Sequence, residues 1–170
     1  MSIDHEEDEE TMRDGHISAR DYALPVFKDR TKTTRDMARL LRQSGVKFDA
    51  IAGCGFSGLL LTGSLAALLY KHTIAVRKDP ERTFRYEDMM AQGAVGAARY
   101  IIVDDLISSG RTVCHMIHEI ENEARKQGFA RPKLVAVYLY YSRGDGSPET
   151  DWFAREDGTE VVVPVYRRPR

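Results

Sequence analysis

Short apolar runs recur along the chain and predict strands. Tyr100–Val103 is β-branched and aromatic throughout, which is typical of a strand covered on both faces in a parallel sheet. Three further runs predict strands at residues 48–52, 73–76 and 134–141. These four segments are the expected centre of the fold.

Between the apolar runs, hydrophobic residues recur at helical spacing. The first predicted helix begins at Thr33 or Thr34, either of which could cap it, and ends at Gly45. Two more are predicted over residues 59–70 and from Thr112 to Gly128. The alternation of helices and strands predicts an α/β fold, with an open, largely parallel, twisted sheet flanked by helices.

The pattern divides the chain into three parts. Residues 1–20 carry six acids within positions 4–10 and almost no apolar side chains, so we expect a mobile tail. Residues 21–141 form the predicted core. Residues 142–170 open on a turn cluster and contain a last strand at 160–166, where Pro164 predicts a sheet edge. We expect this C-terminal part to form a small hood.

Residues 79–98 are rich in charge and have no clear periodicity. Such a long irregular stretch inside a compact domain is typical of a functional lid, although a solvent-exposed hairpin without a role fits the same pattern.

Composition narrows the classes of function. The 170 residues carry a formal net charge of −1, which gives no overall attraction to nucleic acid or an anionic membrane. No apolar run is long enough to span a bilayer, and the acidic first twenty residues are unlike a secretory signal, so we expect a cytoplasmic protein. Cys54 and Cys114 have no metal-ligand spacing and fit a reducing compartment.

Three segments with complementary chemistry each follow a predicted strand. Gly53–Gly58 offers backbone donors between glycines, Arg77 and Lys78 offer two cations, and Asp104–Thr112 offers two acids followed by a small-residue loop at a helix N-terminus. The carboxyl ends of parallel strands share one edge of a sheet, so we expect all three segments to face one crevice.

The acids Asp104 and Asp105 repel phosphate and therefore need another role. They can accept hydrogen bonds from sugar hydroxyls, or hold Mg²⁺ through water. The crevice thus predicts a ligand with a phosphate, a diol and a second anionic group.

Two other motifs compete for the glycine-rich segment. Gly53–Gly58 matches G-x-G-x-x-G between a strand and a helix, the dinucleotide fingerprint. That interpretation expects an acid after the next strand, where Arg77 and Lys78 stand. An NADP-type site could use these cations, but it leaves Asp104–Thr112 unexplained. The segment also nearly matches the nucleophile elbow G-x-S-x-G around Ser57, but Leu59 occupies its second glycine position, which argues against that role.

The segment Val103–Thr112 closely resembles the signature of the type I phosphoribosyltransferases, which use 5-phosphoribosyl-1-pyrophosphate (PRPP) with Mg²⁺. It joins a hydrophobic strand, two acids, two apolar residues and a small-residue loop in one stretch. The resemblance covers roughly residues 34–141. It implies phosphoribosyl transfer to a nucleobase, which yields a nucleoside 5′-monophosphate and pyrophosphate, and a homodimer is the expected assembly.

The resemblance also implies roles for individual residues. Asp104 and Asp105 would be the catalytic pair that binds the ribose hydroxyls and holds Mg²⁺ through those hydroxyls or water. The 5-phosphate would lie on Ser108, Ser109, Gly110, Arg111 and Thr112. Pyrophosphate would be bound by Cys54, Gly55, Phe56, Ser57, Arg77 and Lys78.

The acceptor base is expected to be a purine, as in nucleotide salvage, because the C-terminal part is similar to the hoods of purine members. There Arg143 and Trp152 are the candidate base-binding residues. Ser108 stands where 6-oxopurine members often carry an acid, which argues against hypoxanthine or guanine.

Phe56 and Ser57 stand where many members carry a loop cation. This keeps open the alternative of a PRPP-binding regulator with little or no turnover.

Overall fold

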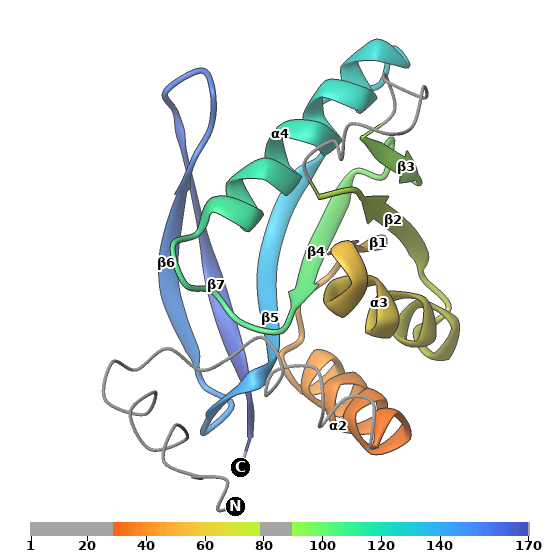
Figure 1. The fold of residues 1–170 in the computed structure, drawn as a ribbon, viewed down its shortest axis with the longest axis vertical. Coiled ribbons are helices and arrows are strands. Elements are labelled where there is room, and N and C mark those ends of the chain that lie inside the picture. Colours follow the sequence, from red (N-terminus) through yellow and green to blue (C-terminus); the bar gives the residue numbers. More distant parts are fainter. Residues whose placement is uncertain (1–28, 79–89, 170) are drawn as a thin grey trace, which may run out of the picture.

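A computed structural model describes residues 29–78 and 90–169, without the side chains of residues 142 and 143 (Figure 1). Seven strands form one sheet in the order β3-β2-β1-β4-β5-β7-β6. The inner strands, which pair in parallel, are β1 (Ala50–Cys54), β2 (His72–Val76), β4 (Arg99–Asp104), β5 (Lys133–Gly144) and β7 (Glu160–Pro169). The edge strands β3 (Ala91–Gly93) and β6 (Pro148–Ala154) pair antiparallel. The largely parallel α/β sheet is confirmed.

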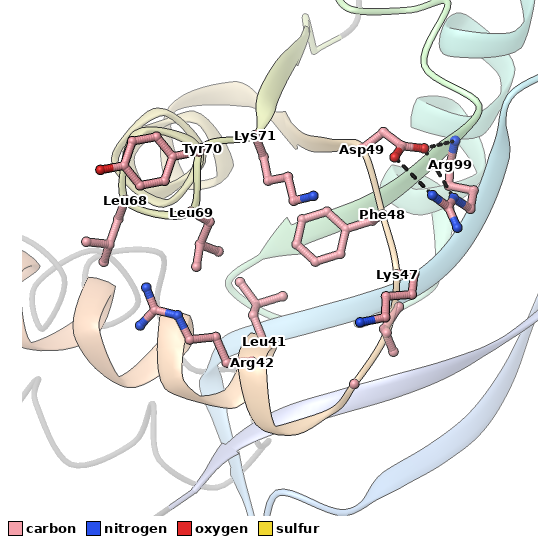
Figure 2. A pocket seen from close by; sticks show the side chains of 12 residues that line it. Leu41, Arg42, Lys47, Phe48, Asp49, Leu68, Leu69, Tyr70, Lys71 and Arg99 are labelled. Atoms are coloured by element: carbon pink, nitrogen blue, oxygen red, sulfur yellow. Dashed lines mark hydrogen bonds and ion pairs between the residues drawn. The ribbon is translucent and has the colours of Figure 1, made fainter.

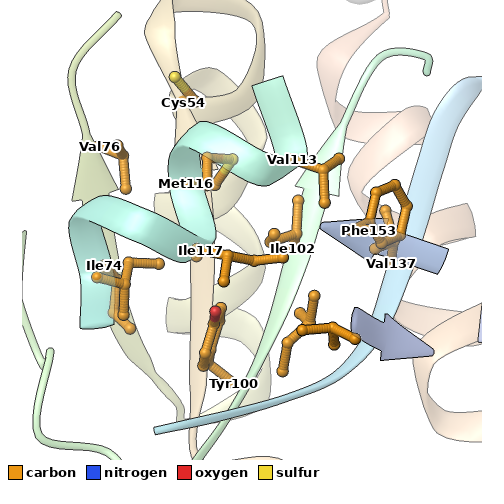
Figure 3. Close-up of a cluster of buried hydrophobic side chains, with 14 of the residues drawn as sticks. Cys54, Ile74, Val76, Tyr100, Ile102, Val113, Met116, Ile117, Val137 and Phe153 are labelled. Carbon is orange, nitrogen blue, oxygen red and sulfur yellow. The ribbon is translucent and has the colours of Figure 1, made fainter. Parts of the chain in front are cut away.

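Helices cover both faces of the sheet (Figure 1). On one face α2 (Arg30–Gln43) and α3 (Gly55–Leu69) pack with Ile101 and Val103 of β4. On the other, α4 (Arg111–Lys126) packs with Tyr100 and Ile102, as Figure 3 shows. The alternating side chains of β4 thus supply both cores. Both cores therefore support the carboxyl end of β4, where Asp104 lies.

Two helix starts differ from the expectation. Asp29, rather than Thr33 or Thr34, caps α2, because its carboxylate accepts a 3.0 Å hydrogen bond from the backbone N–H of Lys32. The two threonines are buried inside the helix. Helix α3 begins at Gly55, four residues earlier than predicted, so much of the expected glycine-rich loop is its first turn.

The C-terminal part continues the sheet. The turn after β5 is confirmed, but the strand β6 was not expected. The prediction that the last strand lies at an edge is wrong, because β7 pairs with both β5 and β6. Pro164 is tolerated there because it comes one residue before Val165, where the pairing with β5 begins.

The acidic tail, residues 1–20, and residues 79–89 of the expected lid lie outside the described residues. No helix in the described part of the chain is long and apolar enough to cross a membrane.

Candidate functional site

The two acids lie where β4 ends, and the backbone fixes both carboxylates. Asp104 accepts a 2.9 Å hydrogen bond from the backbone N–H of Asp105, which in turn accepts one of 2.8 Å from that of Leu106. The carbonyl of Asp105 accepts a bond from the N–H of Tyr141 on β5. These bonds hold both carboxylates at the carboxyl edge of the sheet.

Asp104 is only 4% exposed. Burial, followed by the charge of Asp105, raises its pKa from 3.8 to about 7, and Lys78 opposes this shift. A ligand that donates hydrogen bonds to Asp104, or a cation beside it, would favour the ionised form. The acid is therefore set to respond to an electropositive partner.

The loop after the acids leads into the N-terminus of α4. Gly110 precedes the helix with a left-handed φ of 73°, and no side chain caps the first turn, which contains no acid. A Cβ at position 110 would meet only Phe153, at 3.6 Å, so conformation rather than space favours glycine there. The first N–H groups of α4 are thus available to an anion.

A cavity of about 230 Å³ joins these features. It is lined by the acid pair, the loop that follows, the start of α4 and Lys78: residues 104–113 and Lys78. The structure therefore brings together the predicted ribose-binding acids, all five predicted phosphate-binding residues and one of the two predicted cations.

The turn between β1 and α3 lies beside this cavity. The Lys78 side chain covers Gly55, because a Cβ at position 55 would lie 2.6 Å from Lys78 Cε. Gly58 lies against β4, where an added Cβ would be 3.3 Å from the carbonyl oxygen of Val103. The Tyr140 hydroxyl donates a 3.1 Å hydrogen bond to the carbonyl of Ser57. Lys78 thus connects this turn with the cavity.

The side chains of the predicted pyrophosphate segment lie in different environments. Cys54 is buried, and its pKa is raised to about 11, chiefly by burial and then by Asp104. It is therefore a neutral thiol at physiological pH. Phe56 is 72% exposed on the first turn of α3. The groups of this turn that suit an anion are its backbone N–H groups, the half-buried hydroxyl of Ser57 and the neighbouring Lys78.

Arg77 lies next to the site but its side chain does not line the cavity. Its backbone N–H donates to the carbonyl of Met90, and its carbonyl lies 2.8 Å from Nε2 of His115 on α4. This contact could not be predicted from the sequence, because it joins residues 38 positions apart. It ties the segment that carries Lys78 to α4.

The two predicted base-binding residues are not placed alike. Trp152 is 61% exposed on β6, beside its partner Val162, and does not line the cavity. Its neighbour Phe153 points to the opposite face and packs near Gly110. Arg143 lies on β5, four residues beyond the level of Asp104, and its side chain is outside the described part.

Within residues 29–78 and 90–169, no group of three or more His, Cys, Asp or Glu side chains could hold a metal. The pair Asp104 and Asp105 nevertheless suits a hard cation that keeps water or ligand oxygens as its remaining ligands. The donor set is therefore compatible with Mg²⁺ shared with a ligand.

Known proteins resemble the chain in sequence. The orotate phosphoribosyltransferase of Neisseria gonorrhoeae is 30% identical over 137 residues, which cover 76% of this chain and 61% of that protein. The enzyme of the same name from Laribacter hongkongensis is 30% identical over 138 residues, with the same coverage. The chain thus spans 61% of the length of these relatives. No family model matches the sequence.

The fold also has a solved counterpart. The orotate phosphoribosyltransferase from Aeropyrum pernix superposes with a TM-score of 0.51 at 18% identity, over 88% of this chain and 77% of that one.

The chain is thus an α/β protein whose parallel sheet carries an acid pair and an exposed helix N-terminus at its carboxyl edge. Together with the sequence relatives and the shared fold, this shows that the chain belongs to the type I phosphoribosyltransferase family.

Proposed function

We propose that the protein transfers the phosphoribosyl group of PRPP to a nitrogen of a nucleobase and releases pyrophosphate. The observation that carries this proposal is the single cavity in which Asp104, Asp105, the start of α4 and Lys78 meet. Each part of PRPP finds a complementary group there: a diol for the acids, a phosphate for the helix N-terminus and a pyrophosphate for the cation.

In this proposal the protein acts mainly by positioning. Asp104 and Asp105 accept hydrogen bonds from the ribose hydroxyls, and residues 108–112 hold the 5-phosphate. Lys78 and the backbone of the β1–α3 turn face the departing pyrophosphate, whose negative charge grows in an oxocarbenium-like transition state. Mg²⁺ on the acid pair, when bound, would neutralise part of that charge. No side chain is required as a nucleophile.

The site indicates less about the acceptor base than about PRPP. A purine was expected from Arg143 and Trp152, but Trp152 does not line the cavity. The relatives, by contrast, are orotate enzymes by name. We therefore propose a nucleobase acceptor and treat purine and orotate as two arms of one experiment.

A PRPP-binding regulator with little turnover is the second candidate. It is favoured by Phe56, an exposed aromatic ring where a loop cation would stabilise pyrophosphate. Lys78 covers the neighbouring Gly55 and could supply the missing charge. The two candidates therefore differ in turnover rather than in PRPP binding.

The experiment mixes the protein with PRPP and MgCl₂, offers orotate, adenine, hypoxanthine, guanine and uracil separately, and measures pyrophosphate release. The Asp104→Asn/Asp105→Asn variant, purified in parallel, reports any contaminating activity. Release with one base supports the enzyme and names its acceptor. PRPP binding without release for any base supports the regulator, and no PRPP binding overturns both. Light scattering on the same samples tests the expected homodimer.

A further inference from the structure

A second and larger cavity, of about 490 Å³, opens at the opposite edge of the sheet. The C-terminal ends of α2 and α3 and the segment before β1 enclose it (Figure 2). We call it the basic pocket and define it by Leu41, Arg42, Lys47, Phe48, Tyr70 and Lys71. The candidate PRPP site lies beyond the other ends of β1 and α3, so the two sites are separate.

The basic pocket has an excess of positive charge. Arg42, Lys47 and Lys71 are exposed, and none forms an ion pair with another described residue. Asp49 is the acid in the lining, and Arg99 engages it through side-chain hydrogen bonds of 3.0 and 3.2 Å. Asp49 also interacts with the charge of Lys71, so the lining holds one acid, Asp49, against the cations Arg42, Lys47, Lys71 and Arg99.

A second question is whether these cations bind the carbonyl groups at the helix C-termini. Helix C-termini carry partial negative charge, which lysine and arginine often offset. Here backbone and hydroxyl groups of the residues just after each helix already donate to the last carbonyls: those of Leu40, Leu41 and Arg42 in α2 and those of Ala66 and Ala67 in α3. These bonds satisfy part of each helix end without using the side chains of Arg42, Lys47 or Lys71.

The base of the pocket is apolar and aromatic. Leu41 and Phe48 are almost fully buried, and the ammonium of Lys71 lies 5.2 Å from the centroid of the Phe48 ring. Figure 2 shows Lys47 and Lys71 on either side of this ring, with Arg42 nearer the end of α3. An apolar surface ringed by cations suits an amphipathic anion.

Tyr70 gives an independent indication of a ligand. It ends α3 in the left-handed conformation, with φ 53°, and is the only residue other than glycine with a positive φ in the described part. Glycine is the usual residue at such a helix end, and a bulky side chain there is strained. The ring is nevertheless 96% exposed at the rim of the pocket. Residues held in strained backbone conformations cluster at functional sites, so Tyr70 is a candidate ligand contact.

We propose that the basic pocket binds a phosphorylated ligand that carries a planar aromatic ring, of the size and chemistry of a nucleoside monophosphate. Arg42, Lys47 and Lys71 would bind the phosphate, and Tyr70 would stack on the ring. The volume of about 490 Å³ is within the range of small-molecule sites. This proposal does not depend on phosphoribosyl transfer, because no residue of the basic pocket belongs to the PRPP site.

Calorimetric titration of the full chain with AMP tests the proposal. We expect two binding events per chain if AMP also enters the PRPP site, and one if it does not. Arg42→Gln/Lys47→Gln/Lys71→Gln should weaken one event at least tenfold. Arg30→Gln/Lys32→Gln/Lys133→Gln removes three exposed cations elsewhere and should leave both events unchanged. Asp104→Asn/Asp105→Asn should affect only the other event, so failure of the catalytic proposal is read separately.

The Tyr70→Gly variant tests the role of the aromatic ring in binding without disturbing the backbone at the end of α3. Glycine accepts the left-handed conformation, so we expect an unchanged or slightly higher melting temperature. Loss of the stacked ring should weaken the AMP event of the basic pocket about tenfold. Inorganic phosphate and adenosine, titrated separately, should each bind much more weakly than AMP.

Three results would overturn the proposal. The first is an AMP isotherm that the glutamine triple variant leaves unchanged. The second is an affinity for inorganic phosphate or adenosine equal to that for AMP. The third is a Tyr70→Gly variant that binds AMP as tightly as the unmodified chain.

Discussion

The two strand-to-helix junctions at the carboxyl edge of the sheet are built in opposite ways. β1 passes directly into α3, since Cys54 ends the strand and Gly55 begins the helix. Between β4 and α4 there are six residues, from Asp105 to Gly110. Both junctions follow parallel strands that pair with each other, so they end side by side.

The difference shows that one edge of the sheet holds two junctions with different structural constraints. The short junction depends on close backbone contact: a Cβ on Gly53 would lie 2.2 Å from Oγ1 of Thr62 and 2.8 Å from the carbonyl carbon of Gly58. The long junction has room, since its loop lines a cavity and carries the acids. Close packing restricts which residues the β1–α3 junction tolerates, whereas backbone conformation and charge restrict those of the β4–α4 junction.

The largest expected effect comes from removing the charges of the long junction. Asp104→Asn/Asp105→Asn should weaken PRPP binding by roughly 100- to 10,000-fold, because hydrogen bonds to charged groups contribute about 1.5–3 kcal/mol each. Titration calorimetry with PRPP and MgCl₂ measures the change, and circular dichroism checks the fold. Unchanged affinity would show that the ribose contacts lie elsewhere.

The second test compares glycines. Gly53→Ala forces a Cβ into the β1–α3 contact and should destabilise the protein by about 1–3 kcal/mol or more. Gly110→Ala meets only conformational strain and should cost roughly 1–2 kcal/mol.

The control for these variants is Gly63→Ala on α3, where a Cβ meets nothing within 4 Å. It should stabilise the protein by about 0.5–1 kcal/mol, because alanine favours the helix. Urea denaturation ranks the three variants. A Gly53→Ala protein as stable as the Gly63→Ala protein would contradict the close packing described for the short junction.

The third test concerns the cation that connects the junctions. Lys78 lines the cavity and covers Gly55, whereas Arg77 does not line it. Lys78→Gln should therefore weaken pyrophosphate binding about tenfold, and Arg77→Gln by less than about threefold. Competition of pyrophosphate against PRPP measures both constants. Equal losses would mean that both cations contact pyrophosphate.

The fourth test concerns the pH dependence of stability. The folded protein holds a proton on Asp104 more tightly than the unfolded chain does, since the pKa rises from 3.8 to about 7. Stability should therefore fall as the pH rises from about 4 to about 7 and change no further above that range.

Asparagine cannot ionise, so Asp104→Asn should remove this loss. The melting temperature of the variant, relative to the unmodified protein, should be higher at pH 8 than at pH 5 by on the order of 5 °C. Differential scanning calorimetry at both pH values measures it. The same difference at both values would show that Asp104 ionises normally in the folded protein.

Much of the fold could be predicted from local pattern. The four core strands and three helices appear within a few residues of their expected positions. The spacing of apolar residues within each segment is enough to predict its secondary structure. The missed strand β6 has no such period: Pro148–Ala154 is mostly polar, and only Phe153 is buried. It forms because β7 supplies its hydrogen-bonding partner. A strand stabilised chiefly by its neighbour leaves little trace in its own residues.

In the candidate site, too, some features could be predicted from local sequence and others depended on distant segments. The acid pair, the candidate phosphate-binding loop and their place after a buried strand could be predicted from one continuous segment, Val103–Thr112. The sequence did not show which of Arg77 and Lys78 lines the cavity, nor that Trp152 points away from Phe153 and does not line it. Such facts depend on strand register and on how the β6–β7 hairpin packs, which are long-range properties.

The sequence alone determined that this chain forms a parallel α/β sheet with a small-residue loop and a helix start after two acids, because strand period, helix start and loop chemistry are local. The tertiary structure decided that Asp104 is buried enough to hold a proton near neutral pH, and that Lys78 reaches across Gly55 to the cavity. It also brought Arg42, Lys47 and Lys71 around one pocket, although they belong to separate segments. Burial and charge proximity arise only when distant segments pack together.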